Sequence, residues 1–140
     1  MGEKTISIYC DGGARGNPGP SAGAFVVVSN GKVLHKQAKY LGHATNNVAE
    51  YEAVILALTW LSEKGRFSVR QSVIVNLDSE LVTKQMSGLY KIKNSKLKTL
   101  FLTAKKLESQ LPFKIFYKWS PRSKNRLADF LVNKELDRNT

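Results

Sequence analysis

The chain has 140 residues, a single cysteine and a formal net charge of +11, with 22 Lys and Arg against 11 Asp and Glu. This length fits one domain spanning residues 1–140, which can bury a core without a disulfide or a structural metal. The sequence has no cationic start followed by an apolar stretch and no run of 18 apolar residues, so we expect neither a signal peptide nor a membrane span, and a cytoplasmic protein. The oligomeric state does not follow from the sequence, and a monomer is the working expectation. The positive charge favours a polyanionic partner with a phosphate backbone, although a basic face can also serve solubility alone.

The first 42 residues alternate in the manner of β-strands. Strands are predicted at 5–11, 22–29 and 32–41. Asn30-Gly31 favours a two-residue hairpin turn between the last two, which predicts an antiparallel meander. Cys10 lies within the first apolar run, and we expect a small buried side chain there.

The remainder of the chain alternates helices with strands. Helices are predicted at 46–64, 79–86, 94–111 and 124–137, and strands at 72–77 and 113–119. Asn46 and Asn47 are candidate caps of the first helix, with Gly65 as its stop, and Gly88 is the stop of the second. The predicted fold is α/β: a five-stranded mixed sheet, made of the antiparallel meander of the first three strands plus two parallel strands, with helices on both faces.

Four acidic residues stand at positions that suggest a common site. Asp11 ends the first predicted strand and Asp78 follows the fourth, and ligands gather at the carboxyl ends of strands in α/β sheets. Glu50 lies on the apolar stripe of its helix and so points toward the core, unless it forms a capping box with Asn47. Asp129 lies near the start of the last helix, where an acid is also favoured by the helix dipole.

Together these acids have the composition of a site for two hard, oxygen-preferring cations such as Mg²⁺. Crowded carboxylates raise one another's pKa, so cations are needed to keep them ionised at neutral pH. Two such ions about 4 Å apart can drive in-line hydrolysis of a phosphodiester.

Four segments, each containing one of these acids, resemble the motifs of the type 1 ribonuclease H family. They are 9–20 (YCDGGARGNPGP), 45–51 (TNNVAEY), 77–82 (LDSELV) and 121–129 (PRSKNRLAD), and the resemblance extends from Ile6 to about Glu135. It implies a ribonuclease H-like fold and cleavage of the RNA strand of RNA–DNA hybrids, leaving 5′-phosphate and 3′-hydroxyl ends. It also implies that Asp11, Glu50, Asp78 and Asp129 bind two Mg²⁺, with Mn²⁺ as a substitute.

Residues in and between the same segments are candidates for contacting the hybrid. They are Gly12, Asn17, Thr45, Asn46, Asn47, Glu80, Lys91, Lys93, Asn94 and Arg122. Thr45 matches a position that helps to hold a DNA phosphate. Minor-groove contacts, where 2′-hydroxyls mark RNA, are matched by Asn17, Asn46, Asn47 and Glu80. Asn46 and Asn47 can also act simply as helix caps.

The chain departs from the family pattern at two places. Many members carry a His in the loop before the last acid, and here Trp119 stands at that position. His35 and His43 are expected at the surface or in a loop, so we predict a slower enzyme or a substitute group. The long basic handle of some members is replaced by the shorter lysine-bearing connection 89–98, which we expect to grip the DNA strand with a salt-dependent affinity.

Two alternatives remain open at this point. A hybrid-binding module without catalysis would share the fold, but a neutral residue would then be expected at one of the acidic positions. A DNA resolvase or integrase would share the carboxylates but not the Asn-Asn-x-x-Glu segment or the Gly-Asn-Pro-Gly-Pro turn.

Overall fold

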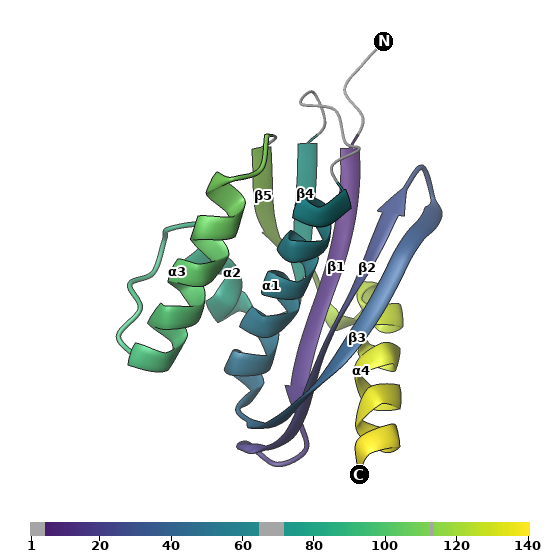
Figure 1. Cartoon of the computed structure of the whole chain (residues 1–140), viewed down its shortest axis with the longest axis vertical. Coiled ribbons are helices and arrows are strands. Elements are labelled where there is room, and N and C mark those ends of the chain that lie inside the picture. The colour runs from purple at the N-terminus through teal and green to yellow at the C-terminus, as the bar shows by residue number, and fades with distance from the viewer. Residues whose placement is uncertain (1–4, 65–71, 113) are drawn as a thin grey trace.

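The computed structural model describes residues 5–64, 72–112 and 114–140. Its elements are β1 (Thr5–Ala14), β2 (Gly19–Ser29), β3 (Lys32–Ala44), α1 (Asn46–Lys64), β4 (Ser72–Leu77), α2 (Glu80–Met86), α3 (Ser95–Ser109), β5 (Lys114–Trp119), a 3₁₀ turn (Arg122–Lys124) and α4 (Arg126–Asn139) (Figure 1). The strands form one sheet in the order β3-β2-β1-β4-β5. β1, β2 and β3 pair antiparallel, while β4 pairs parallel with β1 and β5, so the predicted mixed sheet is confirmed.

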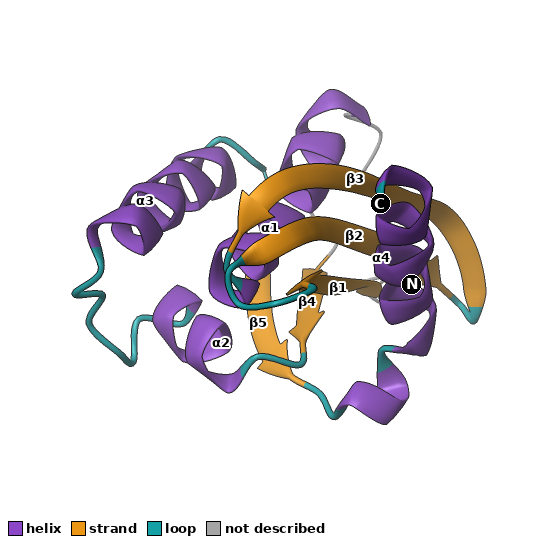
Figure 2. Ribbon diagram, turned by 90° about the horizontal axis from the view of Figure 1, so that it is seen from below, coloured by secondary structure: helices purple, strands orange, loops and turns teal. Residues whose placement is uncertain are grey.

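Helices cover both faces of this sheet, as predicted. α1 packs on β1 and β2 and is itself covered by α3, whereas α4 packs on the opposite face of β1, β2 and β3 (Figures 1 and 2). In the described part of the chain, no helix is both long and apolar enough to cross a bilayer.

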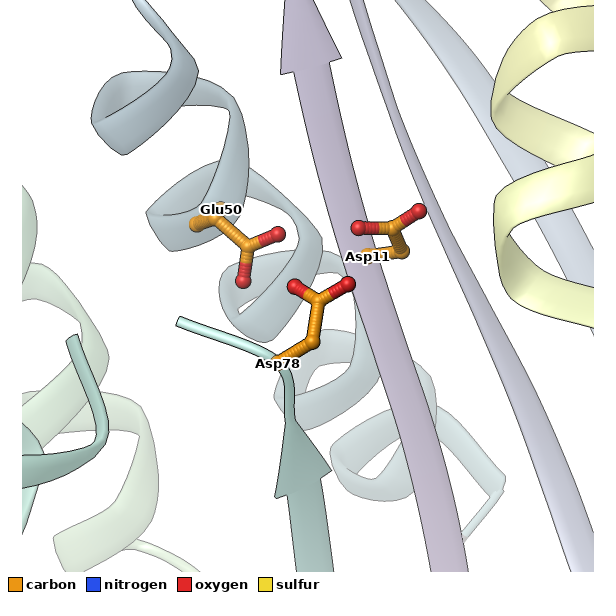
Figure 3. A group of neighbouring side chains, drawn as sticks. All are labelled: Asp11, Glu50 and Asp78. Atoms are coloured by element: carbon orange, nitrogen blue, oxygen red, sulfur yellow. The ribbon is translucent and has the colours of Figure 1, made fainter. Parts of the chain in front are cut away.

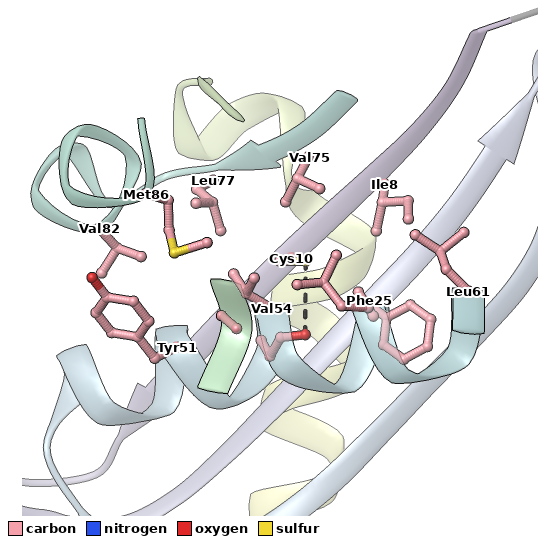
Figure 4. Close-up of a cluster of buried hydrophobic side chains, with 14 of the residues drawn as sticks. Ile8, Cys10, Phe25, Tyr51, Val54, Leu61, Val75, Leu77, Val82 and Met86 are labelled. Carbon is pink, nitrogen blue, oxygen red and sulfur yellow. Dashed lines mark hydrogen bonds between the residues drawn. The ribbon is translucent and has the colours of Figure 1, made fainter. Parts of the chain in front are cut away.

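The main core lies between the sheet and α1 (Figure 4). It includes Ile8 and Cys10 of β1, Phe25 of β2, Tyr51, Val54 and Leu61 of α1, Val75 and Leu77 of β4, and Val82 and Met86 of α2. Alternate residues of each strand face this side, and burying one large apolar side chain contributes about 1.5 to 3 kcal/mol. Cys10 is fully buried, as predicted, and its Sγ lies 3.9 Å from the carbonyl oxygen of Ala53.

Local signals in the sequence identify two turns correctly. Asn30 and Gly31 both have positive φ, 52° and 75°, as a type I′ hairpin turn requires. Gly88 has a φ of 79° directly after Ser87 caps the end of α2, so the predicted helix stop is confirmed. The predicted stop at Gly65 and the predicted strand start at Phe113 lie outside the described residues.

The prediction that Asp11 ends its strand is wrong. β1 continues to Ala14 and β2 begins at Gly19, so Asp11 lies inside a strand. Gly12 and Gly13 continue the antiparallel pairing with β2, although glycine runs usually indicate a loop. At Gly12 the reason is a close helix, described below, that leaves no room for a side chain.

Several other boundaries, and the cap of α1, also differ from the prediction: α2 begins at Glu80 and α3 spans Ser95–Ser109. β3 extends to Ala44, so His43 lies inside a strand, and α4 begins only at Arg126, after the 3₁₀ turn. α1 is capped by Thr45, because the backbone N–H of Val48 donates to Thr45 Oγ1 at 3.2 Å, and not by either of the two asparagines that follow.

Candidate active site

The site forms where β1 extends past its parallel neighbour. The last pair between β1 and β4 joins Cys10 to Leu77. Beyond that point the backbone N–H of Gly12 donates to Glu50 Oε1, at 2.8 Å. Two residues later the N–H of Ala14 donates to a second α1 side chain, Asn46 Oδ1, also at 2.8 Å. The first two turns of α1 therefore complete the edge of β1, and the capping-box alternative for Glu50 is wrong.

Gly12 is required by this approach of α1. A Cβ atom on Gly12 would lie 2.2 Å from the carbonyl carbon and 2.3 Å from the carbonyl oxygen of Ala49. Because these are backbone atoms of a helix, they cannot move aside as a flexible side chain can. Glycine at this position thus brings Glu50, the next residue of α1, against β1.

Three of the four predicted acids meet at this edge. Each of Asp11, Glu50 and Asp78 offers a carboxylate oxygen, and these oxygens lie within 4.8 Å of one another (Figure 3). Asp11 and Glu50 are buried, whereas Asp78, just after β4, is partly exposed. The acidic trio, as we call these three residues, faces a cleft of about 460 Å³ that has mostly polar walls.

Asp129, the fourth acid, does not join the trio, but it lies close enough to Asp11 to help raise the pKa of that residue. It lines the same cleft from the first turn of α4, but it does not belong to the group whose oxygens lie within 4.8 Å. α4 lies on the opposite face of the sheet from α1, which is why the two helices approach Asp11 from different sides.

Ionisation of the buried carboxyls of the trio is electrostatically unfavourable. Burial, with a further contribution from the negative charge of Asp78, raises the pKa of Asp11 from its ordinary value of 3.8 to about 7. Burial, followed by the charges of Asp11 and Asp78, raises the pKa of Glu50 well above its ordinary value. The interaction with Glu50 acts in the opposite direction and partly lowers the pKa of Asp11. Protons therefore compete with any cation for this site near neutral pH.

The donor set fits a divalent cation. Glu50 Oε2 and Asp78 Oδ2 are buried atoms without a hydrogen-bond partner among the described residues. Asp78 Oδ2 has only a longer ionic contact, 3.6 Å from Nε of the exposed Arg122. Buried carboxylate oxygens without donors are costly, and a hard cation satisfies them. The trio therefore suits a divalent metal ion.

Several of the predicted hybrid contacts near the trio form hydrogen bonds or ion pairs within the protein. The backbone N–H of Asn46 donates to Asn17 Oδ1 at 3.0 Å, which ties the β1–β2 turn to the start of α1. Asn47 lines the cleft beside the trio, and Thr45 caps α1. Glu80 is exposed and pairs with Lys84 at 2.7 Å, and this lysine lowers the pKa of Glu80.

The remaining predicted contacts are more distant or have local roles. Lys91 and Lys93 are exposed in the connection between α2 and α3, and Asn94 caps α3 by accepting from the N–H of Leu97 at 3.0 Å. Lys91 lines a second hollow near α2, away from the trio.

The position where the family often has a histidine is occupied by a half-exposed indole. Trp119 Nε1 donates to the backbone oxygen of Asp78 at 3.3 Å, so the indole supports the chain that carries an acid of the trio. His35 stacks on Trp60, 4.8 Å between ring centroids, and His43 is exposed. Both histidines lie on β3, and neither lines the acidic cleft.

Sequence reasoning missed three residues that shape this region. Asn125 is buried and donates from Nδ2 to the carbonyl oxygen of Cys10 at 2.8 Å, next to Asp11. Ser79 caps α2 and lines the cleft, and Arg15 reaches from the end of β1 to α4. All three stand inside the recognised motifs, but their partners are distant in sequence or become visible only in the folded chain.

Comparison with known proteins places this geometry in a family. The model of the Reverse transcriptase-like family matches residues 9–135. A bifunctional protein of Mycobacterium tuberculosis is 39% identical over 134 residues, which cover 94% of this chain and 35% of that protein. Ribonuclease HI of Halobacterium salinarum is 36% identical over 137 residues, which cover 94% of this chain and 64% of the relative. The chain thus spans about a third of the mycobacterial protein and under two thirds of the archaeal one.

Solved structures support the same assignment over the whole fold. LC11-RNase H1, isolated from compost and solved in complex with an RNA/DNA hybrid, has a TM-score of 0.91 and 43% sequence identity to this chain. The match covers 96% of this chain and 98% of that protein. The family predicted from the four motifs is confirmed: the chain belongs to the Reverse transcriptase-like family, as a ribonuclease H of type 1.

Proposed function

We propose that the protein hydrolyses the RNA strand of RNA–DNA hybrids, and that the acidic trio binds the divalent cations for this reaction. The observation that carries the proposal is the trio itself, three carboxylates within 4.8 Å of one another, with buried oxygens that lack hydrogen-bond donors. It stands at the edge of a sheet shared with ribonucleases H1. We further propose a single domain, a monomer and a cytoplasmic location.

Asp11, Glu50 and Asp78 would hold two Mg²⁺ ions, and Asp129 would join them from α4. Mn²⁺ is the proposed substitute, because carboxylate oxygens suit both ions. When bound, such ions activate a water molecule and stabilise the leaving oxygen of an in-line displacement. Water then adds to phosphorus and the P–O3′ bond breaks, which gives the 5′-phosphate and 3′-hydroxyl ends.

The chain's own residues orient the substrate around the cleft. Asn17, Asn46 and Asn47 form a polar rim where the β1–β2 turn meets α1, and we assign them to the minor groove of the hybrid. Gly12 keeps the strand surface free of a side chain beside the trio. Thr45 is the proposed contact to a DNA phosphate.

Arg122 at the cleft and residues of the connection before α3 complete the proposed hybrid surface. Arg122 holds its guanidinium beside Asp78, where it can also meet a phosphate oxygen. Lys91, Lys93 and Asn94 form the proposed grip on the DNA strand, and Glu80 is the proposed contact at the start of α2. Contacts between lysine and phosphate release counterions, so the affinity falls as the salt concentration rises.

A cleavage assay tests the proposal directly. Labelled RNA–DNA hybrid, single-stranded RNA, duplex RNA and duplex DNA are incubated with Mg²⁺, Mn²⁺ or a chelator. We expect cleavage of the RNA in the hybrid with either metal, no cleavage with the chelator, and intact duplex DNA. An intact hybrid with both metals contradicts the proposal, and preferred cleavage of duplex DNA favours a resolvase-like nuclease instead.

A variant pair locates the chemistry. Asp11→Asn removes one charge of the trio, and we expect cleavage to fall by about 10³-fold while hybrid binding remains measurable. Glu63→Gln, an exposed acid near the other end of α1, is the matched control and should keep full activity. Full activity of Asp11→Asn would show that the site is misplaced.

A further inference from the structure

α4 contacts the sheet partly through small side chains. Its buried residues are Ala128, Val132 and Leu136, and the cluster that Val132 and Leu136 join adds the buried Ala22 and Ala24 of β2, with Ala38, Tyr40 and Leu131 partly buried beside them. Small side chains contribute little burial energy, so polar contacts carry a larger share of the attachment of α4 than of α1.

One polar anchor precedes the helix. The Asn125 side chain donates to the carbonyl oxygen of Cys10, and the backbone oxygen of Asn125 accepts from the N–H of Asp129 at 3.0 Å. This anchor is buried and joins the start of α4 to β1 directly before Asp11.

A second anchor lies on the other side of Asp129. Arg15, the residue after β1, places Nη2 2.6 Å from Asp137 Oδ1, 3.3 Å from the backbone oxygen of Asn133 and 3.5 Å from its Oδ1. The Asn133 side chain in turn donates from Nδ2 to the backbone oxygen of Asp129 at 3.0 Å. Asp129 thus lies between the two anchors, and one of them leads back to the turn that holds Asn17.

We propose that Arg15 is a positioning residue, which fixes the angle of α4 and thereby the distance of Asp129 from the acidic trio. The inference rests on the proposed function, in which Asp129 joins the trio in binding cations. Without the outer anchor, α4 can pivot about Asn125 on its apolar contact. Asp129 then samples positions farther from the site, and the cations bind less tightly.

Arginine suits this role better than lysine. Its guanidinium can contact a carboxylate and a backbone oxygen together in a fixed geometry, whereas lysine offers a point charge. Both partners are substantially exposed, at 42% for Arg15 and 69% for Asp137, and an exposed pair contributes little to stability. Its loss should therefore change the site more than the thermal midpoint of unfolding.

The competing role for Arg15 is direct contact with a phosphate of the hybrid, since it also lines the cleft. The two roles differ in what Asp137 does. If Arg15 acts through α4, Asp137→Asn removes the same anchor and reproduces the effect of Arg15→Gln. If Arg15 holds a phosphate, Asp137→Asn frees it and leaves substrate binding intact or stronger.

The experiment compares Arg15→Gln, Asp137→Asn and the double variant with the wild type. Arg138→Gln breaks a pair of the same type within α4, the 3.3 Å contact to Glu135, and is the matched control. Mn²⁺ affinity is measured by calorimetry without substrate, kcat and KM are measured on the hybrid, and hydrogen exchange is followed along α4.

Each single variant should weaken Mn²⁺ binding and lower kcat by about tenfold, with KM nearly unchanged. The double variant should match either single variant in Mn²⁺ affinity and kcat, because the two substitutions remove the same anchor. Exchange should speed up at residues 130–137, while the Arg138→Gln control behaves as wild type in Mn²⁺ binding and kcat.

A raised KM in Arg15→Gln alone, or wild-type Mn²⁺ binding and kcat in both single variants, overturns the proposal. These outcomes are separable from a failure of the proposed function. A wild-type protein that leaves the hybrid intact contradicts the function, whereas an active wild type with unaffected variants contradicts only the role of Arg15.

Discussion

The two sides of the sheet hold their acids in different ways. On one side, α1 presses its backbone against Gly12 and joins a large core of apolar side chains that also includes α2, α3 and four strands. On the other side, α4 packs against the alanines Ala22 and Ala24 of β2. Hydrogen bonds from Asn125 to Cys10 and from Arg15 to Asp137 connect it to β1 and to the residue after β1. Glu50 reaches the site from α1, and Asp129 reaches it from α4.

This difference matches the positions of the two acids. Glu50 is buried, bonded to the N–H of Gly12 and part of the acidic trio. Asp129 stays outside the trio although it lines the same cleft. A helix attached through close backbone packing holds its acid in one place, whereas a lightly attached helix leaves the position of its acid dependent on a few polar contacts.

The largest expected difference between the two sides is catalytic. Glu50→Gln should lower hybrid cleavage by about 10³-fold, since it removes a charge from the trio, whereas Asp129→Asn should cost only about tenfold. Single-turnover cleavage at saturating Mg²⁺ measures both. Equal losses would show that Asp129 is as central as Glu50, and would contradict the comparison.

Two adjacent glycines test the packing on each side. Gly12→Ala places a Cβ into the backbone of α1 and should reduce the free energy of unfolding by about 3 kcal/mol or more. At Gly13 the nearest atoms to a new Cβ are Val132 Cγ1 at 3.9 Å and Asn46 Oδ1 at 4.0 Å. Gly13→Ala should therefore change the free energy of unfolding by less than about 1 kcal/mol. Urea unfolding measures both variants, and a Gly12→Ala protein as stable as Gly13→Ala would refute the close packing.

The smallest effect concerns pH and stability. The pKa of Asp11 rises on folding from 3.8 to about 7, so the native state binds the proton more tightly than the unfolded chain. Without metal, stability should therefore fall as the pH rises through this window and stay low above it. Asp11→Asn removes this loss, so it should raise the free energy of unfolding of the metal-free protein by about 1 to 3 kcal/mol at pH 8, but by little at pH 4.

Unfolding of the metal-free proteins at pH 4, 6 and 8 checks this prediction. Adding Mg²⁺ at pH 8 should raise the thermal midpoint of the wild type and have less effect on Asp11→Asn, because the cation relieves the same repulsion. An increase in the stability of the metal-free wild type from pH 4 to pH 8 would contradict the prediction.

Features that depend on near neighbours were predicted correctly. The Asn30-Gly31 turn, the Gly88 stop and the alternation that buries Cys10 depend on backbone preferences and on period, which a few residues encode. The strand end at Asp11 was predicted wrongly because a glycine run signals a loop, and nothing local reports a helix arriving from position 46 onward.

The sequence alone predicted the helices and strands, a mixed sheet with an antiparallel meander and two parallel strands, and the four acids that the motifs mark. The strand order, the bond between Glu50 and Gly12 across 38 positions, the place of Asp129 outside the trio and the reach of Arg15 to α4 across 122 positions became known only from the folded chain. Such contacts depend on how far each helix can approach the strand. That approach is limited by backbone atoms and by the size of the side chains between them, which no short stretch of sequence contains.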